Sequence, residues 1–131
     1  MINAVDITAE LAGRPVLHAR DQNTTEAEAK AAFAVLARFR DGSVFAGSFS
    51  GDSGWERHQK GDELVHVLDG ATTLTIMMDG GPQSVEMRAG MIIVVPQGHW
   101  HRFRASARVT VLSVTPQPTD HTFAPDPRTV A

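Results

Sequence analysis

Two short segments of this chain concentrate side chains that could bind a metal ion. In the first, Trp55–Gln59 has the composition of a β-strand, whose side chains alternate between two faces, so Glu56 and His58 project to the same face. A Gly-Asp turn at 61–62 then returns the chain, so that Glu63 begins the next strand. Three potential ligands are therefore expected to converge from two neighbouring strands.

The second segment places a further histidine at the start of another strand. It consists of a glycine, the apolar run Met91–Val95, a Pro-x-Gly turn at 96–98 and, after two more residues, His101. The turn separates the apolar strand from the strand that this histidine begins.

Composition narrows the available chemistry. Cysteine and tyrosine are absent, whereas histidine occurs six times among 131 residues. The chain therefore cannot form a disulfide, a thiolate zinc site or a cysteine nucleophile, and no phenol can act as an acid or a base. Any chemistry must use histidine, carboxylates or a metal ion that they hold.

The overall composition is that of a folded, soluble protein. Hydrophobic residues make up 42% and charged residues 21%, which excludes a disordered chain, and the length suits one domain. A net charge of −3 does not suit general nucleic-acid binding. No apolar run, Met91–Val95 included, is long enough to span a bilayer, and the first twenty residues lack the apolar segment of a signal peptide. We therefore expect a cytoplasmic protein that binds neither nucleic acid nor membranes.

Residues 1–40 favour helix and are predicted to form an N-terminal extension. Thr25 and Glu28 make a capping-box pattern, and apolar residues follow at helical spacing, which predicts a helix from Thr25 to Arg38. A shorter helical turn is predicted at Ile7–Leu11.

Residues 41–115 have the pattern of a β-protein. Glycines recur every eight to ten residues, several of them in Asp-Gly or Gly-Asp turns. The β-prone runs between them are Val44–Ser50, Trp55–Gln59, Glu63–Leu68, Thr72–Met78, Ser84–Met87, Met91–Val95, His101–Ala105 and Val109–Thr115. Short strands at this regular spacing predict an antiparallel sandwich or barrel. Residues 116–131 hold four of the seven prolines, which predicts a tail that lies along the surface or is partly disordered.

Together the two ligand-rich segments resemble the two sequence motifs of the cupin superfamily of small β-barrels. The second motif is written G-x5-P-x-G-x2-H-x3-N. It matches at Gly90, Pro96, Gly98 and His101 with every spacing kept, and Ala105 occupies its last position.

The first cupin motif is written G-x5-H-x-H-x(3,4)-E-x6-G. It matches at His58, Glu63 and Gly70, with the expected spacings. Glu56 takes the place of the first histidine, and the leading glycine, Gly51, is one residue out of register.

The resemblance covers roughly residues 44–115, a little over half of the chain, and it implies an all-β fold. The expected architecture is an antiparallel jelly-roll barrel with an N-terminal helical extension. Single-domain cupins commonly pair through sheet edges, so the resemblance also implies a homodimer. By alternation Trp55, His66 and Trp100 face away from the ligand positions, and we expect them to contribute to packing or to the dimer contact.

The resemblance further implies one divalent metal ion near the mouth of the barrel. His58, Glu63 and His101 would hold the ion, and Glu56 would replace the usual third histidine. Two histidines and one carboxylate form the facial arrangement that non-haem Fe(II) favours. A further carboxylate from Glu56 would balance the charge of the ion and favour Mn or Fe(II), with Zn and Ni as alternatives.

The remaining histidines are expected outside the ligand set. His99 occupies a motif position that the family leaves free, which indicates an exposed histidine or one that supports a ligand. His66 alternates away from the face of Glu63, and His18 and His121 are expected to be solvated.

The only basic cluster of note consists of Arg102, Arg104 and Arg108. A solvated strand face is the simpler interpretation of these residues, and an anion-binding surface is the alternative.

Three functions are compatible with these motifs. The first is a metal-dependent dioxygenase, decarboxylase or isomerase that acts on a small chelating molecule. The second is a non-catalytic cupin that binds or senses a small ligand or a metal. The third is a metal-free scaffold, against which four ligand-type residues at converging positions argue. The cupin epimerases that pair a histidine base with a tyrosine acid are excluded, because the chain has no tyrosine.

Overall fold

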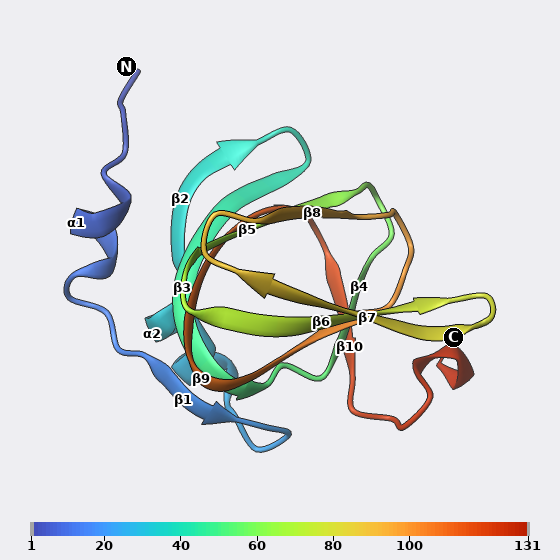
Figure 1. The fold of residues 1–131 in the computed structure, drawn as a ribbon. Helices are drawn as coiled ribbons and strands as arrows, with labels where there is room; N and C mark the ends of the chain where they lie inside the picture. Colours follow the sequence, from blue (N-terminus) through green and yellow to red (C-terminus); the bar gives the residue numbers. More distant parts are fainter. Residues whose placement is uncertain (1, 131) are drawn as a thin grey trace.

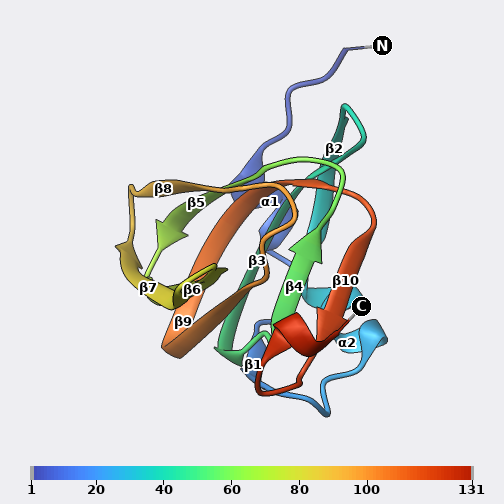
Figure 2. The same ribbon diagram turned by 90° about the vertical axis from the view of Figure 1, so that its right-hand side faces the viewer.

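Two long strands, β3 (Gly42–Asp52) and β9 (His101–Pro116), form the spine of a curled β-sheet. The computed structural model describes residues 2–130. Its strands bend around a common interior, as Figure 1 and the perpendicular view in Figure 2 show. The predicted all-β barrel is therefore confirmed.

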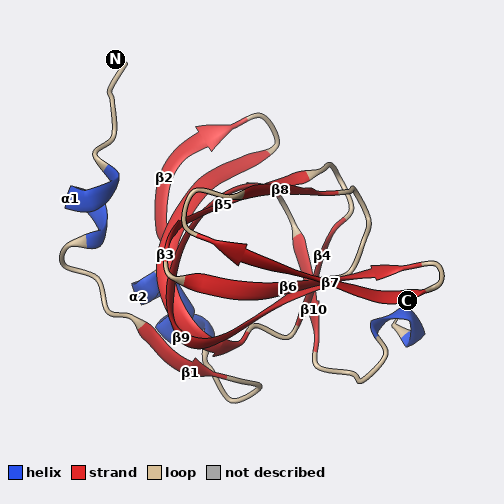
Figure 3. Ribbon diagram, viewed as in Figure 1, coloured by secondary structure: helices blue, strands red, loops and turns tan. Residues whose placement is uncertain are grey.

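Eight shorter strands complete the sheet, and two α-helices and a 3₁₀ turn lie outside it (Figure 3). The strands are β1 (Leu17–Arg20), β2 (Ala34–Phe39), β4 (Trp55–His58), β5 (Glu63–Asp69), β6 (Ala71–Met78), β7 (Gly81–Arg88), β8 (Ile92–Val95) and β10 (Thr119–Thr122). The helical elements are α1 (Ile7–Leu11), α2 (Glu26–Ala32) and η1 (Pro127–Thr129). Among residues 2–130, no helix has the length and the apolar character needed to cross a membrane.

The strand pairing brings the ends of several strands to one place. Along one edge β9 pairs with β3 and, at its first residue, with β4; along the other edge it pairs with β5 at one end and with β6 at the opposite end. His101, the first residue of β9, is the Cα partner of both Glu56 in β4 and Ile76 in β6. All of these pairs are antiparallel, whereas β1 pairs with β3 in parallel. The start of β9 therefore lies where three strands meet.

The side chains that point inward form the main core. They come from all parts of the sheet and include the fully buried Phe49, Val65, Val67, Leu74 and Val109. Because side chains alternate along each strand, burial of this face leaves the polar residues of the same strands outside. β5 shows the alternation directly, with Glu63, Val65 and Val67 buried and the residues between them only half-buried.

Trp55 and Trp100 contribute to packing, which is one of the two roles expected for them, and neither side chain faces solvent. Both are buried, with 4% and 5% of their surface exposed, and they pack with Met77 in a second, smaller core. Two guanidinium groups lie over the indole rings, Arg57 at 4.4 Å from the centre of Trp100 and Arg102 at 5.1 Å from that of Trp55. The indoles on this face of the strands are therefore covered by the chain's own arginines.

The N-terminal extension is only partly helical. The capping box of Thr25 and Glu28 is present, and α1 occupies the predicted residues. The helix that begins there ends at Ala32, because Ala34–Phe39 pairs antiparallel with β3 instead of continuing to Arg38. Phe33 takes an extended conformation and packs on the core residue Phe49, so the contacts with β3 outweigh the local helical pattern.

The C-terminal segment 116–131 contributes a strand that its composition did not predict. β10 pairs with β4 from Thr119 opposite His58 to Thr122 opposite Trp55. Figure 2 shows β4 and β10 side by side. This segment therefore borders the strand that carries Glu56 and His58.

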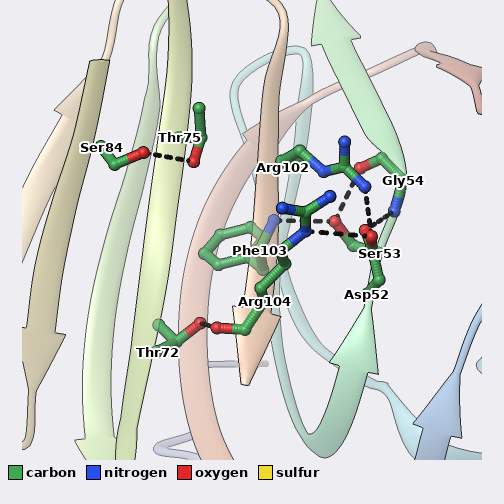
Figure 4. A network of polar contacts seen from close by, with 9 residues as sticks. All are labelled: Asp52, Ser53, Gly54, Thr72, Thr75, Ser84, Arg102, Phe103 and Arg104. Carbon is green, nitrogen blue, oxygen red and sulfur yellow. Dashed lines mark hydrogen bonds and ion pairs between the residues drawn. The ribbon is translucent and has the colours of Figure 1, made fainter. Parts of the chain in front are cut away.

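The basic cluster is neutralised by carboxylates on the neighbouring strand and hairpin. Asp52 pairs with Arg102 and Arg104, as Figure 4 shows, and Arg108 pairs with Asp69 at 3.1 Å. Arg104 and Arg108 are solvated, as the simpler interpretation expects, whereas the side chain of Arg102 is only 15% exposed.

Asp52→Asn should lower the free energy of unfolding by about 1–2 kcal/mol at pH 7, because two arginines lose their counter-charge. Burial alone would raise the pKa of Asp52, but the Gly54 amide and the arginines outweigh it and lower the pKa. A lowered pKa in the folded state stabilises the protein above the pKa of the unfolded state, and this stabilisation is lost as the pH falls. The difference between wild type and variant should therefore shrink below about pH 4.

Urea unfolding at pH 7 and in acid measures both effects. Asp69→Asn is the matched control, because its pair with Arg108 is more than half exposed and should contribute little. Equal stability of the two variants at pH 7 would contradict the prediction.

Candidate metal centre

The three side chains of the site lie at the ends of three strands. His58 is the last residue of β4, Glu63 the first of β5 and His101 the first of β9. The turn at 96–99 fastens these ends together, since the Gly98 amide donates to the His58 carbonyl at 2.9 Å and the Gln97 amide donates to Asp62 Oδ1 at 2.8 Å. The two sequence motifs are thus bonded to each other through their loops.

The three side chains converge in the interior. One ligand atom from each of His58, Glu63 and His101 lies within 4.8 Å of the others. The Nε2 atom of His58 is 3.2 Å from Glu63 Oε2, and the Nε2 atom of His101 is 3.0 Å from Glu63 Oε1. All three side chains are buried.

The polar atoms at the centre of this cluster have no satisfactory partner. His58 Nε2, His101 Nε2 and Glu63 Oε1 are buried and, despite the short distances, make no well-formed hydrogen bond with any described residue. Buried polar atoms without partners carry a free-energy cost, which a shared cation would remove. The donor set therefore fits a divalent metal ion, and the cluster has the composition of the two-His, one-carboxylate facial set.

The opposite sides of the ligands are held by other residues. His58 Nδ1 lies 2.9 Å from Thr119 Oγ1, and His101 Nδ1 lies 3.3 Å from the carbonyl of His99. The Thr115 hydroxyl donates to Glu63 Oε2 at 2.7 Å. Contacts of this kind fix the orientation of a metal-binding histidine and direct its other nitrogen towards the ion. His99 therefore acts through its backbone, while its ring remains outside the cluster.

The electrostatics keep Glu63 charged. Burial would raise the pKa of this carboxyl, but the adjacent imidazoles of His101 and His58 outweigh burial and lower the pKa to about 2. Burial likewise would lower the pKa of His101, but the charges of Glu63 and Glu56 raise it. The carboxylate is thus ready to bind a cation at neutral pH, in competition with protons on the histidines.

Glu56 lies beside this cluster but outside the group of three. It faces His101 across the β4–β9 pair and lines the same cavity as His58 and Glu63. Its carboxylate is not among the ligand atoms that lie within 4.8 Å of one another. The structure therefore brings together three of the four expected ligands and places the fourth at the wall of the adjoining cavity.

The cavity beside the cluster has a volume of about 340 Å³. Four of the six phenylalanines line it, Phe33, Phe45, Phe49 and Phe103, and the cluster forms its polar end. His121, expected to be solvated, is exposed and also borders the cavity. A mostly apolar pocket with a few convergent polar groups is typical of a small-molecule site.

Sequence reasoning missed the residues that support the ligands from distant segments. Thr115 lies at the end of β9 and Thr119 at the start of β10, 52 and 61 positions from the ligands that they contact. Arg20, from the N-terminal extension, also lines the cavity. No local signal marks these residues, because only the strand pairing brings them to the site.

The fold and the cluster together define a small antiparallel β-barrel with a buried histidine–carboxylate centre at one end of an apolar cavity. The family model described as the cupin domain matches residues 49–115, so the chain belongs to the cupin family. This match includes His58, Glu63 and His101.

Three relatives illustrate the similarity. The acireductone dioxygenase of Rhodopseudomonas palustris is 40% identical over 60 residues, which are 46% of this chain and 36% of that protein. A cupin-2 domain protein from Shewanella frigidimarina superposes with a TM-score of 0.56 at 24% identity, over 65% of this chain and 79% of the other. The hydroquinone 1,2-dioxygenase of Sphingomonas sp. TTNP3 superposes with a TM-score of 0.57 at 18% identity, over 75% and 72% of the two chains.

Thr115→Val should weaken metal binding by about tenfold or more, because the carboxylate of Glu63 loses the hydroxyl that orients it. Thr115→Ser keeps the hydroxyl and should stay close to wild type. Competition with a chromophoric chelator measures the affinity.

Thr75→Val is the matched control. This threonine forms a hydrogen bond with Ser84 on an exposed part of the sheet, as Figure 4 shows, and it is not one of the residues that hold the three side chains of the cluster. If Thr115→Val bound metal as tightly as Thr75→Val, the hydroxyl would have no role in the centre.

Proposed function

We propose that this protein is a metal-dependent enzyme of the dioxygenase type that acts on a small chelating molecule. The observation that carries the proposal is the convergence of three buried, unpartnered ligand atoms, from His58, Glu63 and His101, at the end of a phenylalanine-lined cavity. The acireductone dioxygenase that the chain resembles over 60 residues supports the choice among cupin activities.

The donor set favours a metal that can bind both protein and substrate. Two histidines and one carboxylate occupy one side of an ion and leave positions for ligands from the cavity. A divalent ion in this place would supply Lewis acidity and, in the case of iron, redox chemistry towards oxygen. We propose Fe(II) or Mn as the preferred ion, with Zn and Ni as alternatives.

The chain's own residues would orient the ligands and exclude water. Thr115, Thr119 and the His99 carbonyl hold the ligands from behind, so that their donor atoms point into the cluster. The phenylalanine walls surround the reacting group of a bound substrate with apolar surface.

Glu56 is proposed as a further ligand. No hydrogen bond or ion pair with residues 2–130 holds its carboxylate, and its strand position opposite His101 puts it next to the cluster. A small rotation of the side chain towards the ion would complete a set of two histidines and two carboxylates. The metal affinity of Glu56→Gln, measured beside wild type, reports this contribution.

Metal content and oxygen uptake test the proposed activity. Protein purified without an affinity tag should contain about one divalent ion per chain, and Glu63→Ala should contain almost none, because the ion loses the only carboxylate in the buried cluster. Oxygen uptake with the iron-loaded protein should occur with some members of a panel of small chelating acids, diols and enediols. The variant should show no uptake.

Each result has a defined meaning. Equal oxygen uptake by wild type and Glu63→Ala after metal loading would exclude the proposed enzyme activity at this metal centre. Metal-dependent binding of panel compounds without any turnover would instead indicate a non-catalytic cupin that binds or senses a ligand.

We also propose that the protein forms a homodimer through the outer face of β8. Ile92 and Val94 alternate towards solvent on this strand and are 62% and 52% exposed, in a strand that pairs only with β5 among the described strands. Exposed apolar side chains on neighbouring positions of a strand favour burial against another surface.

Light scattering tests this assembly. Wild type should have the mass of a dimer, and Ile92→Thr combined with Val94→Thr should have that of a monomer. Val35→Thr is the matched control, because Val35 is 61% exposed on β2 and should leave the mass unchanged. A monomeric wild type would overturn the proposal.

A further inference from the structure

Arg20 lies in the wall of the cavity that contains the metal cluster. It ends β1, and it lines the cavity together with His58 and Glu63. Its guanidinium carbon is 5.0 Å from the ring centre of Phe49 and 5.5 Å from that of Phe33. The cation is therefore held between aromatic rings at the cavity surface.

The guanidinium has no carboxylate partner of its own. Among residues 2–130, no ion pair and no side-chain hydrogen bond involves Arg20. Two carboxylates act on it electrostatically: Glu56, which lines the same cavity, and Asp52, which is already paired with Arg102 and Arg104. Burial lowers the pKa of Arg20, yet a guanidinium stays charged in proteins. A half-buried cation with unused N–H donors faces the cavity.

The backbone holds Arg20 at this place. β1 runs parallel to β3 with Arg20 opposite Gly51, and a Cβ on Gly51 would lie 2.4 Å from the Arg20 backbone nitrogen. Gly51 also has a φ of +95°, which favours glycine. The amide of Ala19 donates to Ser50 Oγ at 2.9 Å, which adds a second attachment. The position of the arginine is therefore determined by close backbone packing.

One aromatic wall connects Arg20 to the metal cluster. The Arg20 guanidinium lies over the ring of Phe49. Phe49 packs edge-on against Phe103, with 5.9 Å between the ring centres, and Phe103 packs against His101 at 6.1 Å. A ligand lying along this wall would meet a metal ion at one end, apolar rings in the middle and a cation at the other end.

The other charges that line the cavity would leave the positive charge of Arg20 available to a bound ligand. With a divalent ion bound, the carboxylates of Glu56 and Glu63 would be balanced by the ion. Lys30 at the rim is paired with Glu26 at 3.2 Å. Arg20 would then remain as the positive charge without a counter-charge, which favours a ligand that carries one negative charge away from the ion.

We propose that Arg20 binds a carboxylate of the substrate, and that the substrate is an organic anion with chelating oxygens at one end, a flat apolar body and a carboxylate at the other end. The proposal rests on the proposed function, because it describes the substrate of the same metal site. Arg20 acts as a specificity-determining residue in this arrangement, since its planar fork matches a carboxylate.

Binding of matched probes to the Zn²⁺-loaded protein tests this role without turnover. The probes are 3,4-dihydroxybenzoate and 3,4-dihydroxyphenylacetate, each compared with its neutral amide by isothermal titration calorimetry. In each pair the diol and the ring are the same, so the difference reports the carboxylate. Wild type should bind at least one carboxylate about tenfold more tightly than its amide.

Arg20→Gln should abolish this preference and leave the affinity for the amide unchanged. Arg20→Lys, which keeps the charge without the fork, should retain an intermediate preference. Arg108→Gln, which removes an arginine outside the cavity, is the matched control and should behave like wild type. Unchanged amide binding by Arg20→Gln also shows that this variant is folded.

Two outcomes distinguish this proposal from the one on which it rests. Equal binding of carboxylates and amides by wild type, or an unchanged preference in Arg20→Gln, would overturn the role of Arg20. Removal of Zn²⁺ should weaken all four probes. If it weakened none of them while the Arg20-dependent preference persisted, the metal-dependent function would be contradicted and the carboxylate site would stand.

Discussion

The centre of this protein depends on one constraint, the burial of three polar side chains whose donor atoms face one another. His58, Glu63 and His101 lie within 4.8 Å, and their inner atoms lack well-formed hydrogen bonds. Such an arrangement is unfavourable in a protein interior unless a cation occupies the middle. The surrounding structure must therefore hold the three side chains in place against their tendency to find other partners.

The sheet holds the three side chains in place because three of its strands begin or end at the same point and hydrogen bonds connect the loops next to them. The turn at 96–99 hydrogen-bonds the end of β4 and the loop before β5, and Thr115 and Thr119 hold the ligands from behind. The C-terminal segment is thus part of the site, because β10 pairs with the strand that carries His58. Rigid strands are well suited to this task, since small displacements of a ligand weaken a metal site.

The N-terminal extension contributes to the cavity rather than to the centre itself. β1 and α2 place Arg20 and Phe33 over the apolar wall, where the cation lies between rings and has no carboxylate partner among the described residues. A shared fold does not determine which ligand is bound, so ligand choice depends on cavity residues such as these. The outer arginines, by contrast, are used in ion pairs and in covering Trp55 and Trp100.

The amino-acid sequence by itself determined the barrel, most of its strands and the three residues of the candidate metal centre, because alternation, turn residues and motif spacing are local properties of the chain. Only the tertiary structure decided the end of α2, the burial of Trp55 and Trp100 and the place of Glu56. It also decided that Arg20 faces the cavity, since a contact between distant strands leaves no periodic signal in either one. Strand pairing follows from the burial of the whole sheet, and this global requirement overrides local preference wherever the two disagree.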